Sequence, residues 1–82
     1  MACVYILYSK YWKKFYVGSS RNDEARARLS SHNAGKTRST KGGREWVLIN
    51  EEKCLNYTQA RKRENFLKSG AGRKWIRENF SV

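Results

Sequence analysis

Five side chains in this sequence have the types that phosphoester chemistry uses. Tyr5 and Tyr16 stand in two short apolar runs near the N-terminus. Arg28 and His32 follow, four residues apart, and Glu64 comes much later. An arginine binds two phosphate oxygens through its planar fork, a carboxylate binds a divalent cation, and tyrosine or histidine transfers a proton. In a basic chain, this set of residues indicates phosphodiester chemistry.

The charge of the chain predicts a polyanionic partner. Its 82 residues include 18 Lys and Arg against seven Asp and Glu, which gives a formal net charge of +11. The basic residues are spread along the chain, so we expect a folded surface that is positive over a broad area. No stretch approaches the roughly 20 apolar residues of a membrane span, and the N-terminus lacks the layout of a signal peptide. We therefore expect no membrane association and a cytoplasmic location.

Two predicted strands and a turn position the tyrosines. Apolar, β-branched and aromatic residues predict strands at Val4–Tyr8 and Phe15–Ser19. The lysine-rich segment between them, Ser9 to Lys14, is about the length of a β-hairpin loop. Antiparallel pairing would bring the two phenols within reach of one another across the sheet.

Three helices and one further strand follow. A helix begins near Glu24, after Asn22 or Asp23 as its N-cap, and ends at Asn33-Ala34-Gly35. Trp46 to Ile49 is nearly all apolar, which predicts a short strand buried on both faces.

The C-terminal part is predicted to be helical. Asn56 or Thr58 caps a helix over 59–68, with Ala60, Glu64 and Leu67 along one side. The segment 69–72 breaks this helix, and a last helix spans 73–79. The order β-β-α-β-α-α predicts a single α/β domain over residues 1–82, with a small, mainly antiparallel sheet flanked by helices.

The segment between the first helix and the third strand has nothing to bury. It contains hydroxyls, paired glycines and four basic residues, Lys36, Arg38, Lys41 and Arg44. We expect these four side chains to contact a nucleic-acid backbone. The alternative is a soluble surface loop without that role.

Five short motifs occur in the order that a known family shows. They are Val4-Tyr5-Ile6, Tyr16-Val17-Gly18, Arg28-Leu29-Ser30-Ser31-His32-Asn33, Thr40-Lys41-Gly42-Gly43-Arg44-Glu45-Trp46 and Ala60-Arg61-Lys62-Arg63-Glu64. Together they resemble the GIY-YIG nuclease domain, in particular the small stand-alone proteins that are similar to the nuclease module of the excision-repair subunit UvrC. The resemblance covers nearly the whole chain. Two departures are Val4 in place of the first signature glycine and Glu45 where relatives often have proline.

The resemblance implies a metal-dependent endonuclease that hydrolyses DNA phosphodiesters in repair or recombination. It implies DNA as partner, Mg²⁺ or Mn²⁺ as cofactor, no small-molecule cofactor, and a three-stranded antiparallel sheet flanked by helices. By resemblance, the site consists of the signature tyrosines Tyr5 and Tyr16, the signature glycine Gly18, Arg28 at the scissile phosphate, His32 as the accessory residue and Glu64 as the metal ligand. Either tyrosine can accept the proton of the attacking water, and nearby cations are expected to lower the pKa of that phenol.

Simpler interpretations compete with each of these roles. Tyr5 can be an ordinary strand tyrosine, and Arg28 one more solvated arginine on a helix. His32 can be a helix-end residue that is favourable near the negative end of the helix dipole. Glu64 can form an exposed pair with a lysine or arginine on its own helix. For the whole chain, the alternatives are a non-catalytic nucleic-acid-binding module that retains the fold, and a basic adaptor protein. Substrate structure, protein partners and oligomeric state are open.

The spacing before His32 predicts which arginine acts at the phosphate. Arg28 and His32 are related by i,i+4 on a helix, so their side chains can face one phosphate. Arg26 lies about 200° around the helix from Arg28 and faces elsewhere. We expect Arg28→Ala to lower the single-turnover cleavage rate on the order of 10²-fold or more, as the loss of a charge-stabilising donor does. Arg26→Ala is the matched control and should only weaken binding. A larger rate loss in Arg26→Ala than in Arg28→Ala would show that Arg28 is not the arginine at the phosphate.

Overall fold

The computed structural model of the chain describes residues 1–21, 25–33 and 46–80. In chain order, the elements are β1 (Ala2–Ser9), β2 (Lys14–Ser20), α1 (Ala25–Asn33), β3 (Trp46–Cys54), α2 (Tyr57–Lys68) and α3 (Gly70–Asn79). This order confirms the β-β-α-β-α-α prediction and the α/β class. The two candidate caps of α1, Asn22 and Asp23, lie outside the described residues. No helix in the described ranges is long and apolar enough to cross a membrane.

The strands of the described chain form an antiparallel sheet in the order β2-β1-β3. β1 is central because its run from Ala2 to Leu7 is apolar, and every residue of that run is buried. In the β1–β2 register, Tyr5 pairs with Gly18 and Leu7 pairs with Tyr16. The expected proximity of the two tyrosines follows, since Tyr5 and Tyr16 lie diagonally on the same face.

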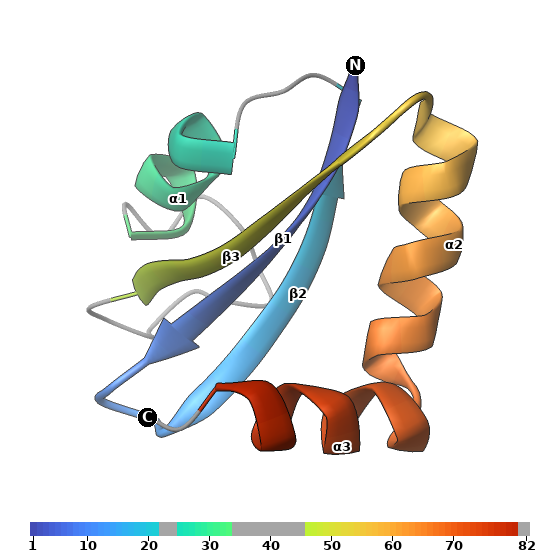
Figure 1. Ribbon diagram of the computed structural model, residues 1–82. Helices are drawn as coiled ribbons and strands as arrows, with labels where there is room; N and C mark the ends of the chain where they lie inside the picture. Colours follow the sequence, from blue (N-terminus) through green and yellow to red (C-terminus); the bar gives the residue numbers. More distant parts are fainter. Residues whose placement is uncertain (22–24, 34–45, 81–82) are drawn as a thin grey trace.

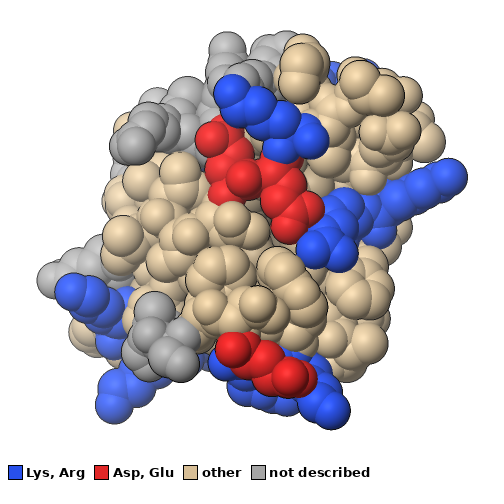
Figure 2. Space-filling model, viewed as in Figure 1, with Lys and Arg blue, Asp and Glu red and all other residues tan. Residues whose placement is uncertain are grey.

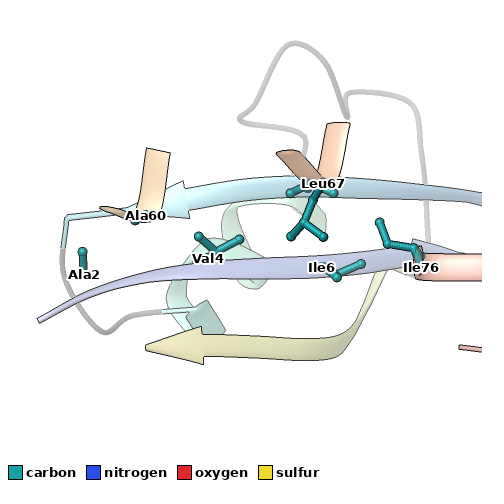
Figure 3. Packing of buried hydrophobic residues seen from close by; sticks show 7 residues of the cluster. Ala2, Val4, Ile6, Ala60, Leu67 and Ile76 are labelled. Atoms are coloured by element: carbon teal, nitrogen blue, oxygen red, sulfur yellow. The ribbon is translucent and has the colours of Figure 1, made fainter. Parts of the chain in front are cut away.

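The two faces of the sheet carry separate apolar clusters. Figure 1 shows α1 on one side of the sheet and α2 on the other. On the α2 side, the buried cluster consists of Ala2, Val4, Ile6, Val17, Ala60, Leu67 and Ile76 (Figure 3). On the α1 side, it consists of Cys3, Tyr5, Leu7 and Trp46, with Tyr16, Leu29 and Leu48 packed against it. Residues of β1 alternate between the clusters, as the period of a strand requires.

β3 is longer and more exposed than the sequence predicted. The expected strand over 46–49, buried on both faces, is a nine-residue strand from Trp46 to Cys54. Buried or half-buried residues alternate with exposed ones along much of it, and the Val47 side chain is 43% exposed. The reason is its place at the edge of the sheet, where charged residues such as Glu51 and Lys53 extend the strand while pointing to water.

Two polar side chains determine the ends of the C-terminal helices. Asn56, one of the two expected caps, begins α2 by accepting a hydrogen bond from the Gln59 N–H at 2.9 Å. Ser69 ends α2 and also caps α3, because its hydroxyl accepts a hydrogen bond from the Gly72 N–H at 3.2 Å. The predicted four-residue break at 69–72 was therefore wrong: one residue makes the break, and α3 begins at Gly70.

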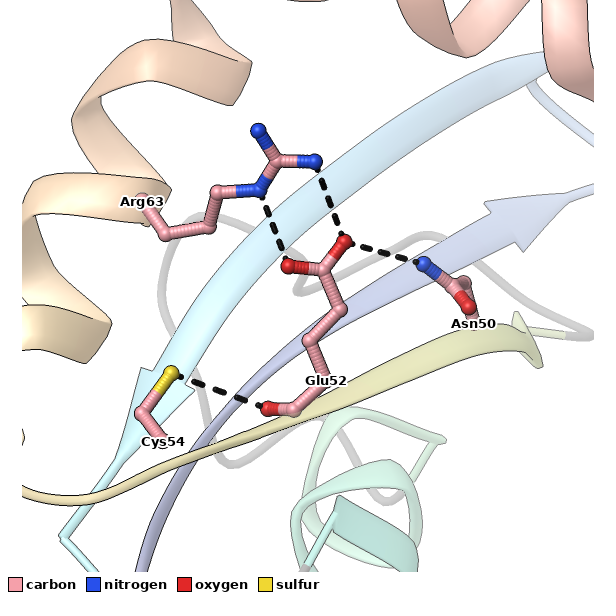
Figure 4. A network of polar contacts seen from close by, with 4 residues as sticks. All are labelled: Asn50, Glu52, Cys54 and Arg63. Carbon is pink, nitrogen blue, oxygen red and sulfur yellow. Dashed lines mark hydrogen bonds and ion pairs between the residues drawn. The ribbon is translucent and has the colours of Figure 1, made fainter.

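An ion pair connects α2 to the edge strand β3. The Arg63 guanidinium donates to both Glu52 oxygens, with Nε–Oε1 at 2.9 Å and Nη2–Oε2 at 3.2 Å (Figure 4). The Asn50 amide donates to the same carboxylate at 3.5 Å. This two-point contact orients the helix that carries Glu64. Figure 2 shows that the acidic side chains on this face of the molecule lie beside Lys and Arg, within a wide uncharged area.

Gly18 lies beneath the ring of Tyr5. A Cβ at Gly18 would come within 2.5 Å of the Tyr5 Oη and 2.6 Å of its Cζ, closer than atoms can pack. Only glycine allows the phenol to extend over β2 at this point. The glycine of the second signature motif is thus explained by the tyrosine of the first.

We expect Gly18→Ala to lower the free energy of unfolding by about 1–3 kcal/mol, because the added methyl must displace the Tyr5 ring. Gly70→Ala is the matched control: a Cβ there meets no atom within 4 Å, so its effect should stay within about 0.5 kcal/mol. Urea denaturation of both variants makes the comparison. Equal stabilities would show that the Tyr5 ring does not occupy this position.

Candidate functional site

His32 lies between the two tyrosines. It comes from the last turn of α1 and is 2% exposed. The Tyr5 hydroxyl and the His32 Nε2 are 3.1 Å apart, within hydrogen-bonding distance. The rings of Tyr16 and His32 have centroids 4.7 Å apart. The histidine thus joins the phenols of both signature motifs from the helix above them.

His32 is neutral at physiological pH. Burial, followed by the nearby positive charge of Arg28, holds the pKa of its imidazole below the ordinary value. A histidine placed only to complement the helix dipole would be charged, so this geometry does not fit that interpretation. A neutral imidazole offers one donor and one acceptor nitrogen, which lets it exchange a proton with Tyr5.

Arg28 extends from α1 into solvent one turn before His32. Its charge is close enough to act on both the His32 imidazole and the Tyr5 hydroxyl. The i,i+4 spacing in the sequence therefore does place an exposed arginine within electrostatic range of the buried tyrosine–histidine pair. The side chain of Arg26 lies outside what the structure describes, so the comparison of the two arginines stays a prediction.

Glu64 approaches β2 from the opposite face of the sheet. It is only 6% exposed, although it is a carboxylate on a basic helix. Its Oε1 accepts a hydrogen bond from the Ser19 hydroxyl at 2.6 Å, and its Oε2 accepts one from the Lys68 Nζ at 2.6 Å. Arg61 adds a longer ion pair at 3.8 Å. The expected pairing along the helix is present, but the pair is packed against the sheet.

Glu64 is ionised despite its burial. Burial by itself raises the pKa of the carboxyl group, but the hydrogen bonds from Lys68 and Ser19 and the charges of Lys68 and Arg61 outweigh it. The net effect is a pKa below the ordinary value. Glu64 is thus a hard anionic oxygen donor at neutral pH.

The two halves of the site meet around the edge of the sheet. Gly18 and Ser19 are consecutive, so the contacts of Tyr5 and of Glu64 lie on opposite faces of β2. β2 is an edge strand, and side chains from both faces can approach around it. Lys68 does so, since its Nζ lies 5.9 Å from the centroid of the Tyr16 ring. The charge of Glu64 also acts on the Tyr5 hydroxyl.

One expectation was wrong for Tyr5. Cations were expected to lower the pKa of the reacting phenol, but the pKa of Tyr5 is raised. Burial is the largest cause, Tyr16 and Glu64 add to it, and the opposing charge of Arg28 is too weak to reverse it. Tyr5 is therefore a protonated hydroxyl that needs a partner to give up its proton.

The sequence did not identify Ser19, Tyr57 and Lys68 as parts of the site. The pKa of the Tyr57 phenol is lowered by hydrogen bonding to Ser19 and to Arg61. Tyr57 thus belongs to the polar group around Glu64. Tyr57, Glu64 and Lys68 recur at seven and four residues along α2, and this helical period is the signal that could have grouped them.

Glu64 has the donor chemistry of a Mg²⁺ or Mn²⁺ ligand. Within the described ranges, no three His, Cys, Asp or Glu side chains lie together as a metal cluster. A single carboxylate can still bind such an ion when waters and substrate oxygens complete the shell. The ionised Glu64 fits this role once the Lys68 amine, whose side chain is 49% exposed, moves away from Oε2.

The four expected DNA contacts, Lys36, Arg38, Lys41 and Arg44, lie outside the described residues. Their role therefore stays a prediction.

Comparison with known proteins gives one match. The family model of the GIY-YIG catalytic domain matches residues 1–77. No curated protein and no solved structure matches the chain.

Titration of His32 should make the stability of the fold pH-dependent. The folded state keeps His32 neutral, whereas the unfolded chain binds a proton below the ordinary pKa of 6.5. The free energy of unfolding should therefore fall as the pH drops below 6.5, by up to about 1.4 kcal/mol per pH unit. The stability that ionised Glu64 contributes is lost only below its ordinary pKa of 4.5, where the unfolded chain begins to take up a proton at this group.

Urea denaturation at pH values from neutral down to 4.5 should show this fall in the free energy of unfolding of the wild-type chain. His32→Gln should abolish it, because the chain has one histidine. A fall of the same size in the Gln variant would mean that another group is responsible.

Proposed function

The chain belongs to the GIY-YIG family of nuclease domains, and we propose that it is a metal-dependent endonuclease that hydrolyses DNA phosphodiester bonds. The observation that supports this proposal best is the convergence of Tyr5, Tyr16, Arg28, His32 and Glu64 at the edge formed by β2. Three of them act electrostatically on the Tyr5 hydroxyl, and the fourth is within hydrogen-bonding distance of it. A purely structural buried tyrosine needs a hydrogen-bonding partner such as His32, but it has no need of the charges of Arg28 and Glu64.

We propose that Tyr5 and His32 act together as the general base. Tyr5 alone is too weakly acidic to form phenolate at neutral pH, because burial raises its pKa. His32 is neutral, and in the tautomer with an unprotonated Nε2 it accepts the Tyr5 hydroxyl hydrogen at 3.1 Å. The Tyr5 oxygen can then take a proton from the attacking water while its own proton passes to His32.

Arg28 and Glu64 would neutralise charge on the phosphate. The exposed guanidinium of Arg28 can bind two phosphoryl oxygens, beside the tyrosines. Glu64 would hold the divalent cation, which supplies Lewis-acid stabilisation of the developing negative charge. Tyr16, whose ring contacts His32, would line the position of the reacting phosphate.

The cellular role belongs to the same proposal. The sequence motifs support a role in DNA repair or recombination and a place in the branch of the family that resembles the UvrC nuclease module. The expected cytoplasmic location rests on the charge and hydropathy of the sequence, not on the motifs. DNA is the proposed partner, and no small-molecule cofactor is required.

A second candidate function is non-catalytic nucleic-acid binding. The observation in its favour is that both Glu64 oxygens already accept hydrogen bonds from Ser19 and Lys68. A carboxylate neutralised by a lysine can be a purely structural feature. The two functions differ in whether a divalent cation makes the protein cleave.

We expect Glu64→Gln to reduce nicking of supercoiled plasmid on the order of 10²-fold or more, because the amide is a poor ligand for the cation. DNA binding in EDTA should be retained or slightly tighter, since one negative charge is removed from a basic surface. Glu51→Gln, an exposed carboxylate on β3, is the matched control and should nick at the wild-type rate.

Nicking by the wild-type chain should need Mg²⁺ or Mn²⁺ and stop in EDTA. Wild-type activity in Glu64→Gln would exclude the metal-ligand role. DNA binding with no metal-dependent nicking by the wild-type chain would favour the second candidate.

A further inference from the structure

A basic groove lies next to the candidate site, between β2 and the α2–α3 corner. It has a volume of about 680 Å³. Its lining contains five cations, Lys13, Lys14, Lys68, Arg73 and Arg77, and the remaining residues Phe15, Tyr16, Val17, Leu67 and Ile76. Among the residues that the structure describes, no acidic side chain lines it. The volume is that of a cleft for a nucleotide-sized molecule, and the walls combine positive charge with apolar surface.

The cations of the basic groove are available to a ligand. Lys13, Arg73 and Arg77 are exposed, and none of these three has an ion-pair partner in the described structure. Of the five cations, Lys68 has an ion-pair partner among the described residues, Glu64. Clustered unpaired cations favour a partner with repeated negative charges.

The basic groove is continuous with the proposed catalytic residues. Tyr16 lines it and also contacts the His32 ring, with centroids 4.7 Å apart. Lys68 lines it and also donates to Glu64 at 2.6 Å. A polyanionic chain bound in the basic groove would therefore extend to the proposed catalytic residues without a gap.

Two exposed aromatic residues stand in the turn that borders the basic groove. Tyr11 is 67% exposed and Trp12 is 36% exposed, whereas the other end of the same turn, Lys13, lines the groove. The Lys14 Nζ lies 5.0 Å from the centroid of the Trp12 ring. Exposed aromatic rings beside cations stack on unpaired bases, which a duplex does not present because its bases cover one another.

We propose that the basic groove and the aromatic turn bind a single DNA strand next to the scissile phosphate, so that the substrate is single-stranded DNA or a single-stranded segment of a larger DNA. The cations bind the backbone phosphates, and Trp12 stacks on a base. This inference rests on the proposed function, because it names the substrate class of the same site. It differs from the expected contacts at 36–44, which belong to another segment of the chain.

Binding to DNA in EDTA tests the groove without cleavage. Fluorescence anisotropy with a labelled oligothymidylate and with a duplex of the same length should show tighter binding of the single strand. Arg73→Gln combined with Arg77→Gln should make the log–log salt dependence for the single strand shallower by about 1.4, since each lost phosphate contact removes about 0.7. Lys62→Gln combined with Lys74→Gln is the matched control: it removes two exposed cations from α2 and α3 outside the groove and should leave the slope unchanged.

A second pair of variants tests the stacking. Trp12→Ala should weaken single-strand binding about fivefold or more, and Trp12→Phe should retain most of the affinity, because phenylalanine keeps an aromatic face. Circular dichroism melting of every variant confirms that the fold is intact.

Any one of the following results would overturn the proposal. Equal slope changes in both double variants would show a general charge effect and no groove. Tighter binding of the duplex, or wild-type affinity in Trp12→Ala, would exclude a single strand as the occupant.

These outcomes are separable from a failure of the proposed function. Absent nicking together with groove-dependent binding would exclude the nuclease activity and support single-strand binding in the basic groove. Normal nicking together with an unchanged salt slope in the Arg73/Arg77 variant would exclude DNA binding in the basic groove and support the nuclease activity.

Discussion

The contact between the buried Tyr5 hydroxyl and His32 is the interaction on which the rest of the site depends. A phenol buried in the sheet needs a hydrogen-bonding partner, and the sheet face itself provides apolar neighbours. His32 meets that need from α1, so the same contact positions the helix on the sheet and the imidazole beside Tyr16. It also explains Gly18, because the Tyr5 ring that contacts His32 lies against Gly18 of β2, where a side chain would clash with it. Folding and the proposed proton transfer thus use one contact.

Placing the site at an edge strand solves a problem of charge. A buried carboxylate beside a buried phenol on one face would leave both without enough donors. Here Glu64 lies on the other side of β2, where Ser19 and Lys68 keep it ionised. The phenol remains protonated in its own apolar surroundings. The strand therefore separates two opposite electrostatic environments. Under the proposed function, one phosphate at the edge would contact both.

Local patterns predicted much of this structure, and tertiary contacts explain the rest. The spacing of Ala60, Glu64 and Leu67 identified the buried side of α2, because a helical period depends only on the chain itself. The length of β3 was wrong because pairing with β1, as far as Ala2 with Cys54, carries the strand through charged residues that look like a loop. The direction of the pKa change at Tyr5 was missed for the same reason. Burial comes from packing against distant segments, which a list of nearby cations does not contain.

The corner at Ser69 gives one hydroxyl an unusual reach. Ser69 is the residue between α2 and α3, and by capping α3 it fixes where that helix starts and in which direction it leaves. Glu64 lies before the corner, and Arg73 and Arg77 lie after it. Under the two proposals, Glu64 holds the metal at the scissile phosphate, and Arg73 and Arg77 bind backbone phosphates of the substrate. The geometry of the corner at Ser69 would then determine how many nucleotides separate the cleaved bond from the phosphates that Arg73 and Arg77 bind.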